Sequence, residues 1–395
     1  MPQNPLLAGV SDPDAQRVLQ ASTDDLARAT RPGFCGNEAS PVQWTAADWD
    51  AMESSREDLF DMAAVRAQFD RERFLIDGYA VLEQIILPKA VEEWTADLQR
   101  GQQFNDALLQ GDWSQIDWFG LGRRMPPEER LTEEAVERAL GGSQAVPQET
   151  DVAGVRTLRH HSVFAEYFPA GHLPYMMNVL THPHMLQLQR MCLGCEAVYF
   201  DHNQLLSRPG GYEGGHWHSH EMGSRYDNRG VATVDEYDAQ ANAILTLCYL
   251  NGFEAEDDGG LKIIRGSHLF RDSNGCRAVT DEEMRQGWLR GRTHPVTGKP
   301  LEIEHFSLRP GSVVCCLSHA AHGVAAKKPN RPTRWCALMC YRRAAETDGH
   351  AQPPTSVPPV WAMKAQRREL PSVLTELLRP SYDLNLTGGR SEYVE

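Results

Sequence analysis

Three histidines alternate with other residues in one short segment, at His216, His218 and His220, and a fourth, His322, follows much later in the chain. Because successive side chains of a β-strand point to opposite faces, a strand through this segment directs His218 and His220 to the same side. Imidazoles supplied by two separate segments suit iron, zinc, copper or nickel better than magnesium or calcium. We therefore predict a catalytic metal site with His218, His220 and His322 as its ligands.

Other side chains near these positions compete for the same role. His216 has the same parity as His218 and His220 and is an alternative ligand, although it lies nearer the preceding glycine-rich loop. Glu221 points to the opposite face of a regular strand and needs a β-bulge to reach the metal. His319 precedes His322 by three residues and is expected to support the site without binding the metal.

The metal ligands must be held by the β-rich second half of the chain. From Ala197 onward, short apolar runs alternate with turns rich in Gly, Pro and Asp, which is typical of an antiparallel sandwich or jelly roll. The expected strands are Ala197–Leu206, Trp217–Met222, Ala243–Leu250, Leu261–Ile264, Leu301–Phe306, Val313–Leu317 and Arg334–Tyr341. This pattern predicts a mainly β core with flanking helices, an α+β arrangement.

Helical patterns flank this core. One strand is expected over Tyr79–Ile86, followed by a helix that begins at Pro88, a favoured first-turn residue, and runs to about Gly101. Further helices are expected over Asp12–Thr30, Thr45–Phe69, Thr132–Leu140, His184–Met191 and Lys364–Leu378. We predict three parts: an N-terminal helical elaboration over 1–68, a catalytic core over 69–343, and a C-terminal extension over 344–395 packed on the core.

Composition narrows the class of protein. The 395 residues carry a formal net charge of -15, which argues against broad binding to nucleic acid or to an anionic membrane. Nine cysteines without regular spacing do not indicate a disulfide framework, and buried thiols are expected for the Cys192-Leu193-Gly194-Cys195 motif. With no signal sequence and no long apolar run, the chain is predicted to be cytoplasmic.

Four segments together resemble the phytanoyl-CoA dioxygenase family of iron(II)- and 2-oxoglutarate-dependent oxygenases. Residues 217–220 match the family's Trp-His-x-Asp motif except at the last position, and residues 259–268 resemble its Gly-x-Leu-x-x-x-Pro-Gly-Ser-His segment. Residues 69–91 resemble the opening strand and helix, and residues 310–334 the closing ligand and co-substrate strands. The resemblance implies a double-stranded β-helix, a cupin-like jelly roll, over roughly residues 69–343.

The resemblance also implies roles for single residues. His218 and His322 would hold iron(II), and Arg334 would pair with the far carboxylate of 2-oxoglutarate, because a guanidinium can form two parallel hydrogen bonds to a carboxylate. Arg331 is the competitor, but it stands between Asn330 and Pro332 in a turn-like segment, whereas Arg334 opens an apolar stretch. Arg208 is expected near the co-substrate.

A residue of the His202-Asn203-Gln204 segment is a further candidate for the co-substrate site. Gln204 is taken as the 2-oxoglutarate ligand of this segment, with packing or edge hydrogen bonding as the alternative.

Two positions depart from the family pattern. His220 stands where the family has its aspartate ligand, so the site loses one negative charge while keeping donors that suit iron. Histidine fills the position that a halide would need, so halogenation is not predicted. Arg265 replaces a proline and is expected to be a local change that adds a positive charge at the rim of the barrel.

These features predict an enzyme that uses Fe(II), 2-oxoglutarate and O2 to hydroxylate a C–H bond of a small molecule and that releases succinate. Desaturation and ring formation are alternative outcomes. The rival functions are a three-histidine cupin-type dioxygenase that does not use 2-oxoglutarate and a non-catalytic binding relative. The sequence does not indicate the substrate or the oligomeric state.

Overall fold

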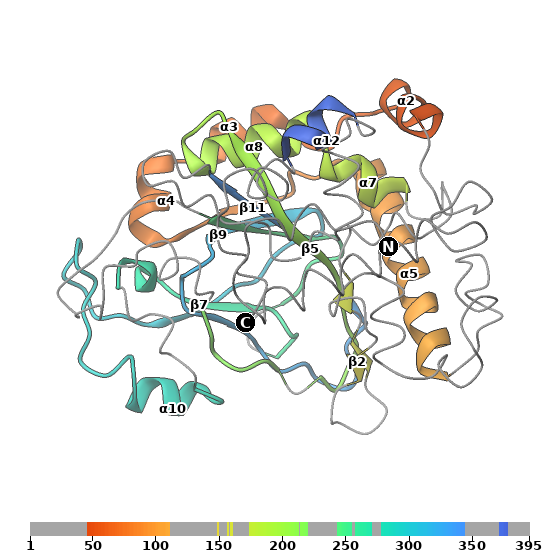
Figure 1. Ribbon diagram of the computed structural model, residues 1–395. Helices are drawn as coiled ribbons and strands as arrows, with labels where there is room; N and C mark the ends of the chain where they lie inside the picture. Colours follow the sequence, from red (N-terminus) through yellow and green to blue (C-terminus); the bar gives the residue numbers. More distant parts are fainter. Residues whose placement is uncertain are drawn as a thin grey trace, which may run out of the picture.

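A computed structural model describes residues 46–110, 148–149, 156–157, 159–160, 174–212, 214–219, 243–254, 257–270, 278–343 and 371–377. The N-terminal helix expected over Asp12–Thr30 and the one expected over Thr132–Leu140 lie outside these residues. The described part combines helices with antiparallel sheets (Figure 1).

The N-terminal helices begin and end at residues suited to those positions. The expected helix over Thr45–Phe69 is two helices, α2 (Ala46–Ser54) and α3 (Met62–Gln68). The Asp61 side chain accepts hydrogen bonds from the first backbone N–H groups of α3, which a helix start otherwise leaves unpaired. Helix α4 (Arg71–Asp77) ends at Gly78, whose φ of 85° lies in the left-handed region that glycine adopts without strain.

The longer helices follow the sequence pattern more closely. Helix α5 (Pro88–Gln110) begins at the predicted proline and continues past Gly101. Helix α8 (Pro183–Leu193) ends at Gly194, which is also left-handed. The remaining helical elements are α7 (Pro174–Leu180), the short 3-10 helix η5 (Ser267–Leu269), α10 (Asp281–Gln286) and α12 (Ser372–Leu377).

Two antiparallel sheets form the β-structure that carries the candidate site. The larger has the order β1-β9-β6-β11-β5-β4 and the smaller the order β10-β7-β8. The large-sheet strands are β1 (Tyr79–Leu82), β9 (Ser312–Leu317), β6 (Ala243–Tyr249), β11 (Arg334–Arg343), β5 (Val198–Arg208) and β4 (Arg159–His160). The small-sheet strands are β10 (His322–Val324), β7 (Leu261–Ile264) and β8 (Ile303–His305), and a separate pair joins β2 (Gln148–Glu149) to β3 (Arg156–Thr157).

Alternation along the strands divides the core into layers. On β11, Ala337 and Met339 belong to the apolar cluster beneath the helices, whereas Cys336 and Leu338 belong to a second cluster. That second cluster, here called the inner cluster, joins the large sheet to Leu261 and Ile263 of β7. The large sheet therefore lies between a helical layer and the small sheet, with α3, α8 and α12 on its outer face (Figure 1).

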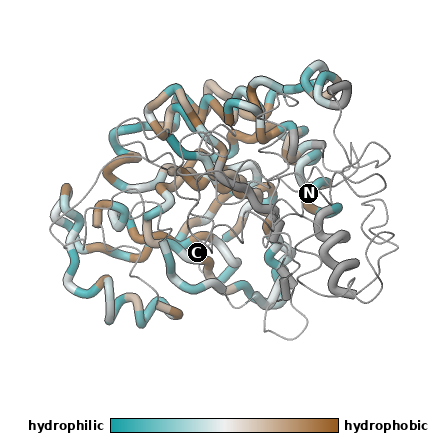
Figure 2. Tube along the Cα trace, in the orientation of Figure 1, coloured by the Kyte–Doolittle hydropathy of each residue, from teal (hydrophilic) through white to brown (hydrophobic). Residues whose placement is uncertain are grey.

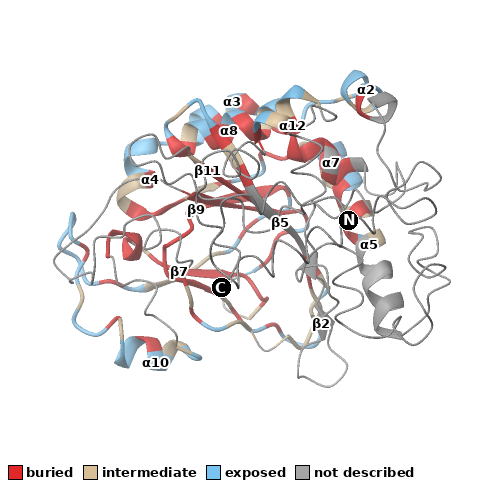
Figure 3. Cartoon of the chain, in the orientation of Figure 1, coloured by how far each residue is buried: buried red, intermediate tan, exposed pale blue. Residues whose placement is uncertain are grey.

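The helical layer is amphipathic, as a layer between solvent and a sheet must be. Apolar and hydrophilic residues alternate along these helices (Figure 2), and their buried residues lie toward the sheet while exposed ones face outward (Figure 3). A third apolar cluster, with Ile264, Trp217 and Met284, covers the other face of the small sheet. No helix in the described ranges is long and apolar enough to cross a membrane.

Candidate active site

His218 and His322 lie side by side. His322 opens β10, and an isolated antiparallel bridge joins the two residues. The backbone N–H of His218 donates to the carbonyl of His322 at 3.0 Å, and the reverse bond is 2.8 Å long. The strand predicted over Trp217–Met222 is thus reduced, in its described part, to this single bridge. The two ring centroids are 4.4 Å apart.

Both rings are held in the form that a metal requires. The Nδ1 atom of His218 lies 3.0 Å from the carbonyl oxygen of His216, and that of His322 lies 2.8 Å from the carbonyl oxygen of Ala320. A carbonyl accepts only from a protonated nitrogen, so this geometry assigns the proton to Nδ1 and a lone pair to Nε2 in the neutral ring. Burial, followed by the neighbouring His218, lowers the pKa of His322 to about 3, so this imidazole is neutral at neutral pH.

The His322 side chain faces the space between the sheets. In the register of β10 and β7, His322 pairs with Ile263, and residues directly opposite in an antiparallel pair project from the same face. Ile263 belongs to the inner cluster. The adjacent residue Lys262 lies on the opposite face, against Trp217 of the third cluster. The ring contact with His322 brings His218 to the inner face as well.

The third predicted ligand, His220, lies outside the described residues. Among those that are described, no three His, Cys, Asp or Glu side chains are grouped closely enough to hold a metal ion. His216, the alternative ligand, is exposed and contributes its carbonyl to His218. His319 is buried against His268, with their ring centroids 6.0 Å apart.

Arg334 is a buried cation on the inner face of the large sheet. It lies two residues before Cys336, so alternation points it into the inner cluster, where its Cζ is 5.4 Å from the ring centre of Tyr249 and 5.8 Å from that of Phe253. Its exposure is only 2%, and its buried Nε and Nη1 have no hydrogen-bond partner in the structure. Buried guanidinium donors without acceptors are rare and costly, so a bound anion would satisfy these two donors.

The neighbouring basic side chains already have acidic partners. Arg331, the sequence competitor of Arg334, donates to Glu254, and Lys327 forms a buried ion pair with Asp258. Arg334 differs from Arg331 and Lys327 because its Nε and Nη1 donors have no hydrogen-bond acceptor among the described residues.

Arg208 and Gln204 are placed by the pairing of β5 with β11. Arg208 lies directly opposite Arg334 in this register. Its Cζ is 5.0 Å from the ring centre of Tyr212, and its Nη1 donates to the carbonyl of Ser207 at 3.0 Å. Two arginines at facing positions repel each other, so the pair favours an anion between them. Gln204 lies opposite Leu338, but its side chain is outside the described part of the structure.

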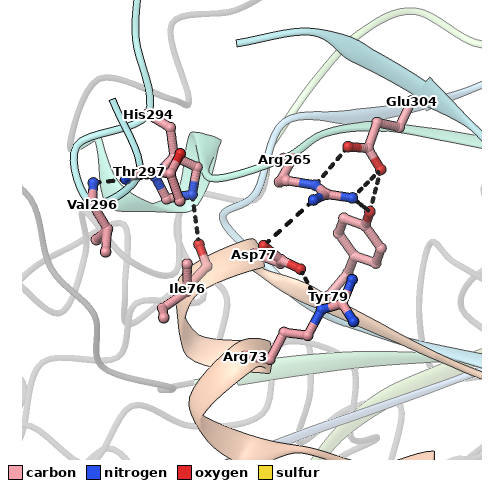
Figure 4. Close-up of polar contacts among 9 residues, drawn as sticks. All are labelled: Arg73, Ile76, Asp77, Tyr79, Arg265, His294, Val296, Thr297 and Glu304. Atoms are coloured by element: carbon pink, nitrogen blue, oxygen red, sulfur yellow. Dashed lines mark hydrogen bonds and ion pairs between the residues drawn. The ribbon is translucent and has the colours of Figure 1, made fainter. Parts of the chain in front are cut away.

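Arg265 does not add a free positive charge at a rim, contrary to the sequence prediction. Its Nε lies 2.6 Å from Glu304, its Nη2 donates to the Tyr79 hydroxyl at 3.1 Å, and Asp77 is 3.9 Å from Nη1 (Figure 4). The two carboxylates neutralise the guanidinium. The network joins β1 at one edge of the large sheet to β8 at one edge of the small sheet, so its role is to connect the sheets.

The Gly-Ser-His turn has a structural role. The Nε2 atom of His268 lies 2.8 Å from the carbonyl of Leu75, and that of His294 lies 3.0 Å from the carbonyl of Ile76 (Figure 4). Both imidazoles therefore satisfy carbonyls at the end of α4, which the helix leaves unpaired. Through its Nε2 atom, His268 fixes the end of α4 against η5.

One group near the histidines was not identified from the sequence. Lys262, Asp281 and Trp217 meet on the outer face of the small sheet, directly behind His218 and His322. A lysine inside the buried run Leu261–Ile264 was the available indication, since a buried lysine requires a partner. The partner, Asp281, could not be assigned without the fold.

Comparison with known proteins gives limited guidance. No family model matches the sequence, and no curated protein matches it. Similar solved structures include the non-heme alpha-ketoglutarate-dependent epimerase SnoN from nogalamycin biosynthesis, at 14% identity over 72% of this chain and 84% of SnoN, with a TM-score of 0.41.

Two further similar structures carry 2-oxoglutarate. EctD from S. alaskensis, with 2-oxoglutarate and 5-hydroxyectoine, has 18% identity over 78% of this chain and 82% of its own, with a TM-score of 0.41. HygX from Streptomyces hygroscopicus, with nickel and 2-oxoglutarate bound, has 12% identity over 70% and 88%, with a TM-score of 0.40. Similarities of this size decide neither the fold nor the activity of this chain.

Proposed function

We propose that this protein is a non-haem iron(II)- and 2-oxoglutarate-dependent oxygenase that hydroxylates a C–H bond of a small molecule. We further propose that the two antiparallel sheets are the layers of a double-stranded β-helix over residues 69–343, similar to the phytanoyl-CoA dioxygenase family. One observation carries the proposal. Two imidazoles with anchored Nδ1 atoms share the inner face with a buried arginine whose donors lack acceptors.

The donor set fits a redox-active divalent metal. His218 and His322 would hold it through Nε2, with His220 as the third ligand. Such a metal, when bound, supplies the activation of O2. Neutral imidazoles are the form required for coordination, and the lowered pKa of His322 keeps that ring neutral over the physiological range.

The buried arginine fits the co-substrate. Arg334 would bind and orient the distal carboxylate of 2-oxoglutarate through Nε and Nη1, with Arg208 beside it and Gln204 as a further polar contact. The surrounding apolar residues, Tyr249 and Phe253 among them, exclude water and strengthen that charge pairing. The same donors argue against a dioxygenase that binds no carboxylate, because Arg334 would then stay buried with unsatisfied donors.

Substitution of an imidazole for the usual carboxylate changes the charge of the site. Three neutral ligands leave the full charge of a divalent cation, whereas a carboxylate ligand would cancel part of it. The site should therefore attract a dianionic keto acid at least as strongly as a site with one aspartate.

Anaerobic reconstitution tests the proposal. Purified protein is titrated with Fe(II) and then with 2-oxoglutarate, while metal content and the visible charge-transfer band of a chelated keto acid are followed. We expect about one equivalent of iron and a band that requires both additions. His322→Ala should abolish the band. Iron uptake without any band supports the dioxygenase that does not use 2-oxoglutarate, and absence of iron, copper and nickel uptake supports a non-catalytic relative.

A further inference from the structure

A compact polar group lies behind the two histidines, on the outer face of the small sheet. We call Lys262, Asp281 and Trp217 the outer-face cluster. The Lys262 Nζ lies 2.5 Å from Oδ1 of Asp281, and the Trp217 indole N–H donates to the same oxygen at 2.8 Å. Lys262 Nζ is also 4.7 Å from the centre of the Trp217 ring. Each member therefore contacts both of the others.

Two members of the cluster lie beside the candidate ligands, one as a neighbour in the chain and one across the small sheet. Trp217 immediately precedes His218, and Lys262 pairs in register with Gly323, which immediately follows His322. Alternation then puts the cluster on one face and the two imidazoles on the other. Gly323 lets Lys262 lie close to the backbone, since a Cβ at this position would be 3.0 Å from the Lys262 Cε. The cluster is therefore joined to both histidines through directly adjacent backbone.

In its described part, residues 214–219, the His218 segment is joined to β10 by one isolated bridge and not by a continuous ladder. Its backbone bonds to other described residues include the bridge to His322 and the bonds from Gly215 N–H to the Val324 carbonyl at 2.9 Å and from Trp217 N–H to the Ala278 carbonyl at 2.8 Å. A regular strand would fix the position by a continuous ladder. Here the side chain of Trp217 adds the restraint that the ladder does not supply.

The contacts of Asp281 are strong enough for this role. Burial alone would raise the pKa of Asp281, but the hydrogen bonds from Lys262 and then Trp217 outweigh it and hold the pKa below its ordinary value. His305 approaches the second carboxylate oxygen at 3.5 Å. The carboxylate is thus ionised and receives charge-assisted hydrogen bonds, which are shorter and stronger than neutral ones.

We infer that Asp281, together with Lys262 and Trp217, positions His218 and His322 for metal binding. These are positioning residues, since none of them lies on the inner face with the imidazoles. The inference rests on the proposed function only in that a metal binds at the two histidines. It adds residues that would set how tightly and in what geometry the metal is held.

Cobalt(II) binding under anaerobic conditions provides the test, because its d–d absorption reports ligand geometry without turnover. The variants are Asp281→Asn, which removes the charge, and Trp217→Phe, which keeps an aromatic ring but removes the N–H donor. Loss of supporting contacts around metal-ligating histidines typically weakens metal binding about 10–100-fold. We expect that loss in Asp281→Asn, a smaller one in Trp217→Phe, and changed d–d intensities in both.

A matched pair separates positioning from general destabilisation. Lys262→Met and Arg265→Met each remove one basic partner of an ion pair, three residues apart in the chain. Both should lower the melting temperature, but only Lys262→Met should weaken cobalt binding. Equal cobalt affinities and spectra in the wild-type chain, Asp281→Asn and Trp217→Phe overturn the inference while leaving the metal site intact. If the wild-type chain itself binds no cobalt, the inference and the metal site fall together.

Discussion

Replacing Arg334 by methionine should strongly weaken the binding of 2-oxoglutarate while leaving the free protein nearly as stable as before. Methionine preserves much of the buried volume next to Tyr249 and Phe253 but removes the charge and its donors. The prediction follows from the state of the guanidinium, which is 2% exposed and has no hydrogen-bond partner at Nε or Nη1. Such donors cost stability in the free protein, and an anion bound to them would offset that cost.

The magnitude can be estimated from the two donors. A hydrogen bond to a charged group contributes about 1.5–3 kcal/mol, so two parallel bonds contribute about 3–6 kcal/mol, or about 10²–10⁴ in affinity. In the free protein, loss of the hydrogen bond to Tyr249 and of the two ring contacts is offset by relief of the buried charge. We therefore expect the free energy of unfolding to change by no more than about 1 kcal/mol.

Lys327→Met is the matched control. Lys327 is 4% exposed, and its ammonium group is paired with the buried carboxylate of Asp258. Its removal leaves that carboxylate without its partner, which typically costs about 3–5 kcal/mol. Arg334→Met should therefore lower the affinity for 2-oxoglutarate with little change in stability. Lys327→Met should lower stability with little change in that affinity.

Two measurements test the predicted difference between Arg334→Met and Lys327→Met. Urea unfolding of the metal-free variants gives stability, and titration of anaerobic iron-loaded protein with 2-oxoglutarate, followed by the charge-transfer band, gives affinity. An Arg334→Met protein that loses as much stability as Lys327→Met would show that the guanidinium is a structural ion-pair partner. Unchanged 2-oxoglutarate affinity in Arg334→Met would refute its assignment to the co-substrate.

Three further outcomes are expected. Gly78→Ala should destabilise the fold by about 2–6 kcal/mol in urea unfolding, since left-handed strain and steric overlap each cost about 1–3 kcal/mol and the new Cβ would lie 2.3 Å from His268 Nδ1. Gly291→Ala, also left-handed but with nothing within 4 Å, should cost only the strain, and equal losses would contradict this account. His220→Asp should retain iron binding and raise turnover of 2-oxoglutarate; complete loss of metal uptake would show that the ligand assignment is wrong. Burial, then the charge of His319, lowers the pKa of His268 to about 3, below the value of about 6.5 expected in the unfolded chain. The unfolded chain therefore binds more protons between these values, and stability falls as pH decreases from about 6.5 toward 3, by up to about 1.4 kcal/mol per pH unit. His268→Gln should flatten the measured slope by that amount, and an unchanged slope would refute the shift.

Local patterns in the sequence were sufficient to predict the bounds of several helices and strands. Strand β7 has the predicted bounds, Leu261–Ile264, because a short apolar run is enclosed by glycines on both sides. Helix α8 ends at Gly194, close to the predicted end at Met191, because glycine accepts the left-handed conformation. In both cases the deciding residues lie within a few positions of the element.

The segment with the alternating histidines was harder to predict. Alternating histidines suggested a full strand over Trp217–Met222, whereas the described residues show one bridge at His218. Alternation fixed the relative faces of neighbouring side chains, but ladder formation depends on which backbone lies alongside. That partner is β10, which is distant in the sequence.

Charge partners were the least predictable feature. Arg265 was expected to add a charge at a rim, but it is neutralised by Glu304 and Asp77. Lys262 was read only as part of an apolar run, and its partner Asp281 begins a later helix. Electrostatic pairing depends on distances of a few ångströms between elements, and composition or periodicity carries no information about them.

The balance of charge inside the sheets links the metal and co-substrate proposals. Lys327 is cancelled by Asp258, and Lys262 by Asp281, whereas Arg334 keeps its charge. A divalent metal on three neutral imidazoles would add to the charge of Arg334, so each cation makes the other more costly in the absence of an anion. A dianionic keto acid that bridges them offsets both costs, and linkage then requires metal and co-substrate to tighten each other's binding by the same factor. An aspartate in place of His220 would reduce this mutual dependence, because it already compensates part of the metal charge. On this proposal, the histidine at position 220 and Arg334 would be two parts of one electrostatic arrangement, which binding of the anionic co-substrate would complete.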